Sequence, residues 1–240
     1  MRAIWIIAKK EYQIAMRSIA NYIIISLFLV ITGVFFSSVI FKIGLAELRT
    51  LFEIMHVIFL FYIPAITMGT IARERQSGTL ELLSTLPIKL SSIVWGKLLA
   101  CLMQLKTLIA ATLVFMVIIA IFGEGIDYGA IVCGYFGLIL AGTAYISIGI
   151  FASSIPSNQV LAFVLALVIS ALFYVLKYVL PLMPLELVAP IQFLSFNSHL
   201  SSFLKGVIDL RDIIYFLAVT LIFTLLAEFN LQSRNLMQER

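Results

Sequence analysis

The sequence predicts an all-α membrane protein with six transmembrane helices, and two observations predict it. Of the 240 residues, 62% are hydrophobic and 12% are charged, with a mean hydropathy of +1.13, which excludes a water-soluble fold. A helix needs about 20 apolar residues to cross a bilayer, and the chain has six such runs between charged residues. These runs cover residues 18–41, 54–72, 98–123, 128–153, 159–179 and 213–227. We expect a single transmembrane domain over residues 1–240.

Residues 1–17 form a long charged amphipathic stretch before the first run, and we expect this segment to be cytoplasmic. The first run lacks a small-residue cleavage site followed by polar sequence, so it is expected to remain as a spanning helix. In the second run, Pro64 removes one backbone hydrogen bond and is expected to kink the helix. That kink can serve packing, or it can act as a lever on the segment that follows.

Residues 73–97 form a polar, amphipathic insert between the second and third runs. Gly78 is a natural break, and we expect a short helix from Thr79 to Leu86 that Pro87 ends. One face of this helix carries Leu80, Leu83 and Leu86. Glu81 is directed away from that face. Such a helix can lie in the lipid headgroups or dock in a groove of a soluble partner.

The fourth run is rich in small residues at multiples of four. The glycines expected to take part in helix packing are Gly134, Gly137, Gly142 and Gly149. Small faces let helices approach closely in lipid. The contacts can lie within one subunit or across a dimer.

Residues 181–212, between the fifth and sixth runs, are too polar and too interrupted by Pro184 and Pro190 to span a membrane. We expect short amphipathic or re-entrant helices at the outer surface. Asp209 is expected to cap the sixth helix, and Asp212 to bond the free N–H groups of its first turn. A contact with substrate is the alternative role for these two residues.

The distribution of basic residues predicts the orientation, because short basic loops resist translocation. Eleven of the 16 Lys and Arg residues fall on the side that carries both termini and the 73–97 insert, and acidic residues outnumber basic ones on the other side. Both termini and the insert are therefore expected to be cytoplasmic. This asymmetry and contact with anionic lipids explain the pI of about 9.1 without any nucleic-acid partner.

The apolar runs hold few groups that could do chemistry. Lys106 is the one serious candidate for a charge in the interior, and its long stem can reach the cytoplasmic headgroups. His56 and His199 lie far apart in sequence, and Cys101 and Cys133 lie in or beside apolar runs. We therefore expect no catalytic residue and no metal site. The chain has no Gly-rich phosphate loop, so it is not expected to be an enzyme with its own ATPase site.

The 73–97 insert also resembles a family motif. Residues 74–81 read Glu-Arg-Gln-Ser-Gly-Thr-Leu-Glu, and Leu-Pro-Ile at 86–88 and Gly-Lys at 96–97 follow. This string resembles the ABC-2 type permeases, the membrane subunits of ABC exporters. In that family a Glu-x-x-x-Gly-Thr-x-Glu segment forms a coupling helix that docks on the ATP-binding subunit. The resemblance implies an ATPase-coupling role for Glu74, Gly78, Thr79, Leu80, Glu81, Leu83, Leu86 and Pro87.

Two further segments extend the resemblance over the whole chain. Ser153-Ser154-Ile155, with Asn158-Gln159 at the start of the fifth crossing, also resembles the family. Residues 205–212, with Asn197, His199 and Phe203 upstream, are similar to the gliding-motility-associated branch of permeases, the Gld F type. The implied architecture is that of an ABC-2, type V exporter, with a cytoplasmic coupling helix and outer amphipathic segments.

The resemblance also implies partners and a location. Two copies of an ABC ATP-binding subunit would hold ATP and Mg²⁺, and a second permease, the same chain or a relative, would complete the membrane part. No cofactor is expected on this chain, which would contact membrane lipids in a bacterial inner membrane. One alternative is a non-transporting anchor or assembly subunit of a larger machine such as a motility apparatus. A secondary transporter is the other alternative, which the charge-poor interior disfavours.

Overall fold

The computed structural model describes residues 2–43, 48–79, 89–123, 126–179, 181 and 184–238. All regular structure in these ranges is helical, and six of the helices are long and apolar enough to cross a membrane. The predicted all-α fold with six crossings is therefore confirmed. The helices are α1 (Arg2–Arg17), α2 (Ile19–Ile43), α3 (Arg49–Thr67), α4 (Ala72–Gln76), α6 (Leu90–Phe122), α7 (Tyr128–Ser154), α8 (Gln159–Val179), α9 (Leu185–Leu194), α10 (Phe196–Leu204) and α11 (Leu210–Gln238).

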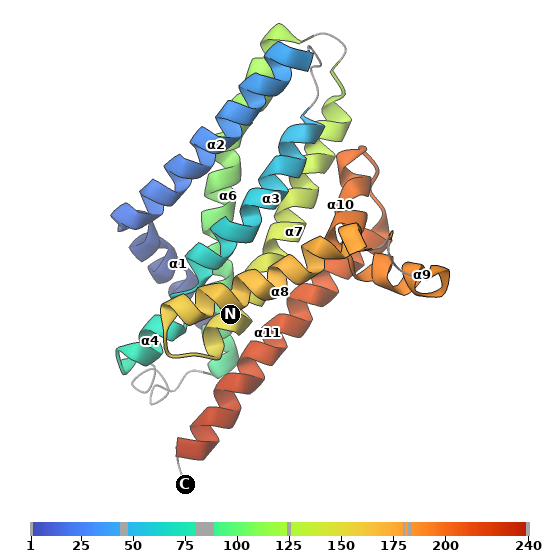
Figure 1. Ribbon diagram of the computed structural model, residues 1–240. Coiled ribbons are helices and arrows are strands. Elements are labelled where there is room, and N and C mark those ends of the chain that lie inside the picture. The colour runs from blue at the N-terminus through green and yellow to red at the C-terminus, as the bar shows by residue number, and fades with distance from the viewer. Residues whose placement is uncertain are drawn as a thin grey trace.

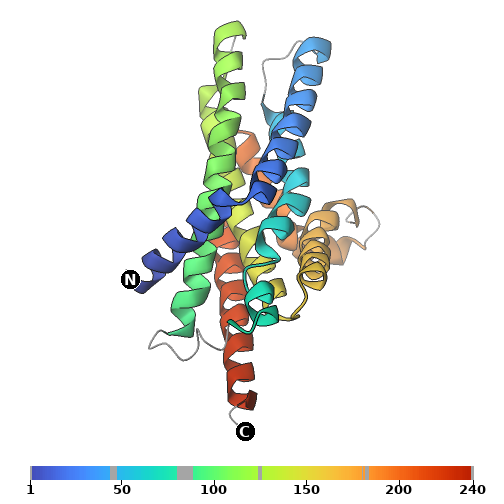
Figure 2. The same cartoon turned by 90° about the vertical axis from the view of Figure 1, so that its left-hand side faces the viewer.

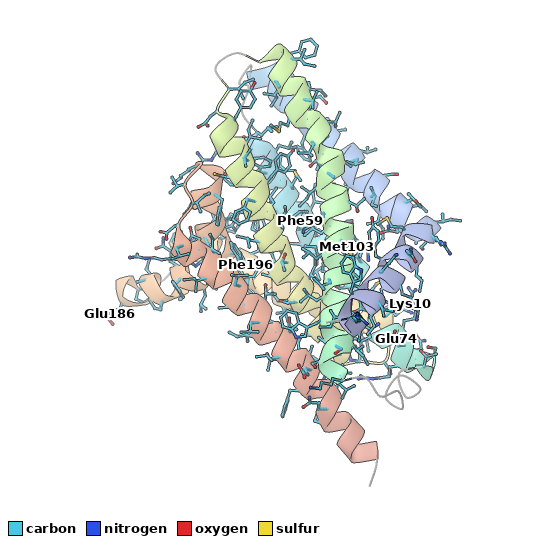
Figure 3. The ribbon with its side chains drawn as sticks, turned by 180° about the vertical axis from the view of Figure 1, so that it is seen from behind. Lys10, Phe59, Glu74, Met103, Glu186 and Phe196 are labelled. Atoms are coloured by element: carbon cyan, nitrogen blue, oxygen red, sulfur yellow. The ribbon has the colours of Figure 1, made fainter. Side chains whose placement is uncertain are left out.

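The six long helices form an elongated bundle with two distinct ends (Figure 1). We call one of them the α4 end: it holds α1, α4, the start of α6, the end of α7 and the last turns of α11 (Figures 1 and 2). The short helices α9 and α10 lie beside the start of α11, away from α4. Seen from behind, Glu74 and Lys10 lie at the α4 end, whereas Glu186 of α9 lies away from both (Figure 3).

Helix α7 forms the centre of the bundle and is the most buried of the six membrane helices. It packs against α3, α6, α8, α10 and α11. Its four predicted packing glycines face, in chain order, Phe52, Phe203, Leu105 and Thr67. A Cβ atom added at any of the four would lie within 3 Å of the facing side chain. In this chain the four glycines therefore allow side chains from α3, α6 and α10 to pack closely against α7.

Helix α3 continues through Pro64, which is fully packed, and ends at Thr67. The Met68 N–H donates to the Pro64 carbonyl at 2.9 Å, and the Thr67 hydroxyl donates to the Ile63 carbonyl at 2.8 Å. The predicted span reached residue 72. The structure instead places a turn after Thr67 and starts α4 at Ala72.

Helices α6 and α11 extend furthest beyond their apolar runs. Helix α6 begins at Leu90, eight residues before the predicted run, and α11 continues to Gln238 although the run ends at 227. Hydropathy marks the lipid-facing length of a helix, whereas the backbone hydrogen bonds continue into polar sequence. The predicted short helices of the 181–212 segment are present as α9 and α10. The predicted helix at 79–86 lies outside the described residues, apart from Thr79.

Candidate coupling site

The described part of the predicted coupling insert consists of helix α4 with the turn after it and the start of α6. Helix α4 ends at Gln76, and Gly78 lies in the turn after it with a φ of +71°, a left-handed conformation that glycine adopts without strain. The Ser77 hydroxyl donates to the Arg73 carbonyl at 3.0 Å, and the Thr79 hydroxyl donates to the Glu74 carbonyl at 3.2 Å. The break predicted at Gly78 is therefore present.

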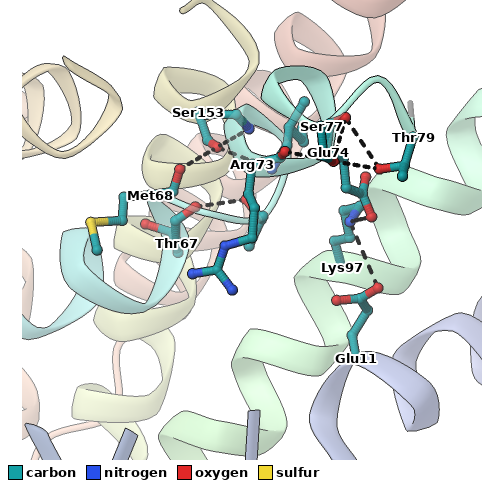
Figure 4. A network of polar contacts seen from close by, with 12 residues as sticks. Glu11, Thr67, Met68, Arg73, Glu74, Ser77, Thr79, Lys97 and Ser153 are labelled. Atoms are coloured by element: carbon teal, nitrogen blue, oxygen red, sulfur yellow. Dashed lines mark hydrogen bonds and ion pairs between the residues drawn. The ribbon is translucent and has the colours of Figure 1, made fainter. Parts of the chain in front are cut away.

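Lys97 of α6 links α4 to α1 (Figure 4). Its ammonium lies 2.7 Å from a carboxylate oxygen of Glu74 and 3.9 Å from one of Glu11, and the side chain is only 2% exposed. A buried ammonium is costly unless it is paired, and removing a partner leaves an uncompensated charge. The ion pairs therefore hold three helices at one point. The second carboxylate oxygen of Glu74 is buried and has no hydrogen-bond partner among the described residues.

Ser153, near the end of α7, joins the end of α3 to the start of α4 (Figure 4). Its hydroxyl accepts hydrogen bonds from the N–H groups of Ile71 and Ala72, both at 3.1 Å. The same hydroxyl donates to the Met68 carbonyl at 2.9 Å. Helix ends leave backbone groups without partners, and Ser153 satisfies such groups on both sides of this turn.

Two arginines and an asparagine connect the same region to α8 and α11. Arg75 donates to the Ile155 carbonyl at 3.0 Å, and Arg73 donates to the Gln159 side-chain oxygen at 3.3 Å. The Asn230 amide of α11 donates to the Ser154 carbonyl at 3.0 Å and to its hydroxyl oxygen at 2.9 Å. Helix α4 is thus connected to α1, α6, α7 and α8, and α7 in turn to α11.

The structure brings together only part of the predicted coupling set. Glu74, Gly78 and Thr79 lie in α4 or directly after it. The residues outside the described ranges are Leu80, Glu81, Leu83, Leu86 and Pro87. The packing glycines follow the length of α7 and form no common site.

Sequence reasoning assigned no coupling role to Lys97, Glu11, Ser153 or Asn230. Lys97, the last residue of the 73–97 insert, is nearly inaccessible to water. A lysine seven residues into a long apolar helix is a signal for a buried partner. The identity of that partner depends on the tertiary fold, because Glu11 and Glu74 belong to other helices.

A second polar cluster lies where α10 meets α11. His199 places Nδ1 2.7 Å from Asp212 Oδ1 and Nε2 2.7 Å from the Phe193 carbonyl, and its ring stacks on Tyr215 at 3.8 Å. A carbonyl only accepts, so Nε2 donates to the Phe193 carbonyl, and Nδ1 shares a hydrogen bond with Asp212. The predicted role of Asp212 as a helix cap is therefore wrong. Asp209 does cap the helix, since it accepts from the Arg211 N–H at 2.8 Å.

The described residues contain no group of three or more His, Cys, Asp or Glu side chains placed to hold a metal ion. Cys101 and Cys133 are free thiols. The polar groups of the α4 end are ion pairs and helix-end hydrogen bonds. This arrangement can transmit force or position a docking segment.

A family model described as ABC-2 family transporter protein matches residues 5–236. The chain belongs to the ABC-2 transporter family. No curated protein matches the chain in a sequence search. As an ABC-2 permease, it is a multi-pass membrane subunit of an ABC transporter and works with an ATP-binding subunit. The similarity to the gliding-motility-associated branch stays a prediction.

Proposed function

We propose that this permease uses ATP hydrolysis by two ATP-binding subunits to move a substrate out of the cytoplasm. The observation that carries the proposal is the attachment of α4 to the bundle. Lys97, Glu74 and Ser153 connect it to α1, α6 and α7. A force applied to the segment after Gly78 would therefore move several membrane helices together.

The proposed docking element is the segment from Thr79 to Leu86, placed on the cytoplasmic side. Support comes from the charge distribution, because most Lys and Arg residues fall on the side that carries this segment and both termini. The membrane in question would be a bacterial inner membrane. The chain itself would hydrolyse no ATP.

The proposal includes a second permease, either another copy of this chain or a relative. The four predicted packing glycines of α7 already pack against side chains of the same chain. The membrane helices with the least buried surface are α2 and α8. We therefore assign the contact between the two permeases to α2 and α8.

The test is co-purification of the ATP-binding subunit with wild-type permease and two variants at matched expression. Glu81→Lys places a repulsive charge at the proposed interface, and Leu83→Asp disrupts the proposed apolar face. Both variants should retain less ATPase, and the permease alone should hydrolyse no ATP. If the segment instead lies in headgroups, Glu81→Lys should strengthen membrane attachment by about 1 kcal/mol and leave co-purification unchanged.

Undiminished co-purification with both variants would contradict docking through this segment. A complex that forms, yet whose ATP hydrolysis responds to no solute, would support the anchor or assembly subunit in place of the transporter.

A further inference from the structure

We propose that a cavity at the α4 end binds the headgroup of a zwitterionic phospholipid. The cavity has a volume of about 180 Å³ and lies between α1, α2, the end of α3 and α6. This is far more than the roughly 10–15 Å³ that one water molecule needs. The inference does not depend on the proposed coupling role of residues 79–86.

Two buried amides line the cavity without adequate partners. Asn21 and Gln104 are each only 6% exposed. Within the part of the chain that the structure describes, the Asn21 side chain makes one hydrogen bond, to the Met16 sulfur at 3.8 Å, which is a weak acceptor. Gln104 has no side-chain hydrogen bond among the described residues. In the described ranges both amides line the cavity without a strong protein partner, so each can form a hydrogen bond with a polar group that occupies it.

The charges around the cavity indicate which polar group fits. Lys97 is already bound to Glu74 at 2.7 Å. Arg73 has an amide partner, Gln159, and no carboxylate within ion-pair distance among the described residues. Its guanidinium is directed away from Glu74 and Lys97 (Figure 4). Glu11 lies 3.9 Å from Lys97 and also lines the cavity. A phosphate would bind Arg73, and an ammonium on the same ligand would be attracted to Glu11.

The position of the cavity favours a membrane lipid as the source of that phosphate. Helix α1 combines charged residues with exposed apolar ones, among them Trp5, Ile6 and Ile14. Such a helix lies at the headgroup level of a bilayer, where Trp is also enriched. The membrane helix α2 begins two residues after α1 ends. The corner between the two helices therefore holds the cavity at the depth of phospholipid headgroups, and Ile14 and Ile24 provide apolar walls beside it.

The test measures binding of dihexanoyl phosphatidylethanolamine to the full-length, delipidated permease in detergent, by native mass spectrometry and thermal unfolding. Wild type should bind this lipid and unfold at a higher temperature with it. Arg73→Gln and Gln104→Met should each weaken binding by about tenfold, the expected loss for one charge-assisted or buried hydrogen bond. Gln13→Met is the matched control, because Gln13 is an exposed amide of α1 that does not line the cavity.

A second measurement separates ligand binding from a structural role. In Gln104→Met the unpaired amide is gone, so the lipid-free protein should unfold at the same or a higher temperature. A lower unfolding temperature, with lipid binding intact, would overturn the proposal. Equal stabilisation by dihexanoylglycerol would exclude phosphate recognition. Equal stabilisation by inorganic phosphate would overturn the lipid as the source and assign the site to free phosphate.

Discussion

At the scale of single residues, Lys97 shows how one buried charge can join distant parts of the chain. Its partners Glu74 and Glu11 come from α4 and α1, and the ammonium is almost sealed from water. Pairs of this kind add little net stability, because desolvation offsets much of their attraction. Breaking one partner is much more damaging than removing both. Lys97 is therefore expected to define the position of α4.

A single and a double variant test whether the ion pair between Lys97 and Glu74 accounts for the stability lost when Lys97 is replaced. Lys97→Met should destabilise the permease by about 3–5 kcal/mol, because it leaves Glu74 as a buried, unpaired carboxylate. The double variant Glu74→Met/Lys97→Met removes both charges and should recover most of that loss. Thermal unfolding in detergent measures both. An unfolding temperature for the double variant as low as that of Lys97→Met would contradict the ion pair as the cause.

At the scale of helices, the sequence predicted the six crossings because each is a long apolar run with its own local signal. The break at Gly78 and the cap at Asp209 were also predictable, since both depend on neighbouring residues. The ends of α6 and α11 were not, because polar sequence continues both helices. Asp212 was misassigned for a different reason. Its partner, His199, comes from another helix, and only the tertiary fold brings them together.

The glycines of α7 offer a test of packing at this scale. Gly134→Ala should cost about 1–3 kcal/mol, because the new methyl group meets the Phe52 ring, which the core holds in place. Gly33→Ala in α2 is the matched control. A Cβ there would meet Phe115 only at 3.9 Å, an ordinary contact. Thermal unfolding of the two variants measures the difference, and equal stability would contradict close packing at Gly134.

At the scale of the whole molecule, the two ends of the bundle differ in what they hold. The α4 end contains the ion pairs of Lys97, the turn between α3 and α4 that Ser153 binds, and the cavity between α1, α2, α3 and α6. The α10–α11 junction, away from α4, holds the hydrogen-bonded His199–Asp212 pair. The family match describes a permease, and the charge distribution predicts which end faces the cytoplasm.

Orientation can be tested with single cysteines in a variant whose Cys101 and Cys133 are replaced by alanine. A cysteine at Ser198 should react in intact cells with a maleimide that does not cross membranes. A cysteine at Gly78 should react only after the membrane is made permeable. Labelling of Gly78 in intact cells would reverse the proposed orientation and remove the basis for a cytoplasmic docking segment.

Because Lys97 is almost completely buried, its ion pair should respond to ionic strength differently from charged contacts on the surface of the permease. Mobile ions screen exposed charges over about 10 Å at 0.1 M salt, but they hardly reach a pair that excludes water. The bonds between Lys97 and Glu74 should therefore persist in concentrated salt, whereas charged contacts on the surface of the permease weaken. A high-salt wash would then remove a peripheral subunit and leave α4 attached to α1 and α6.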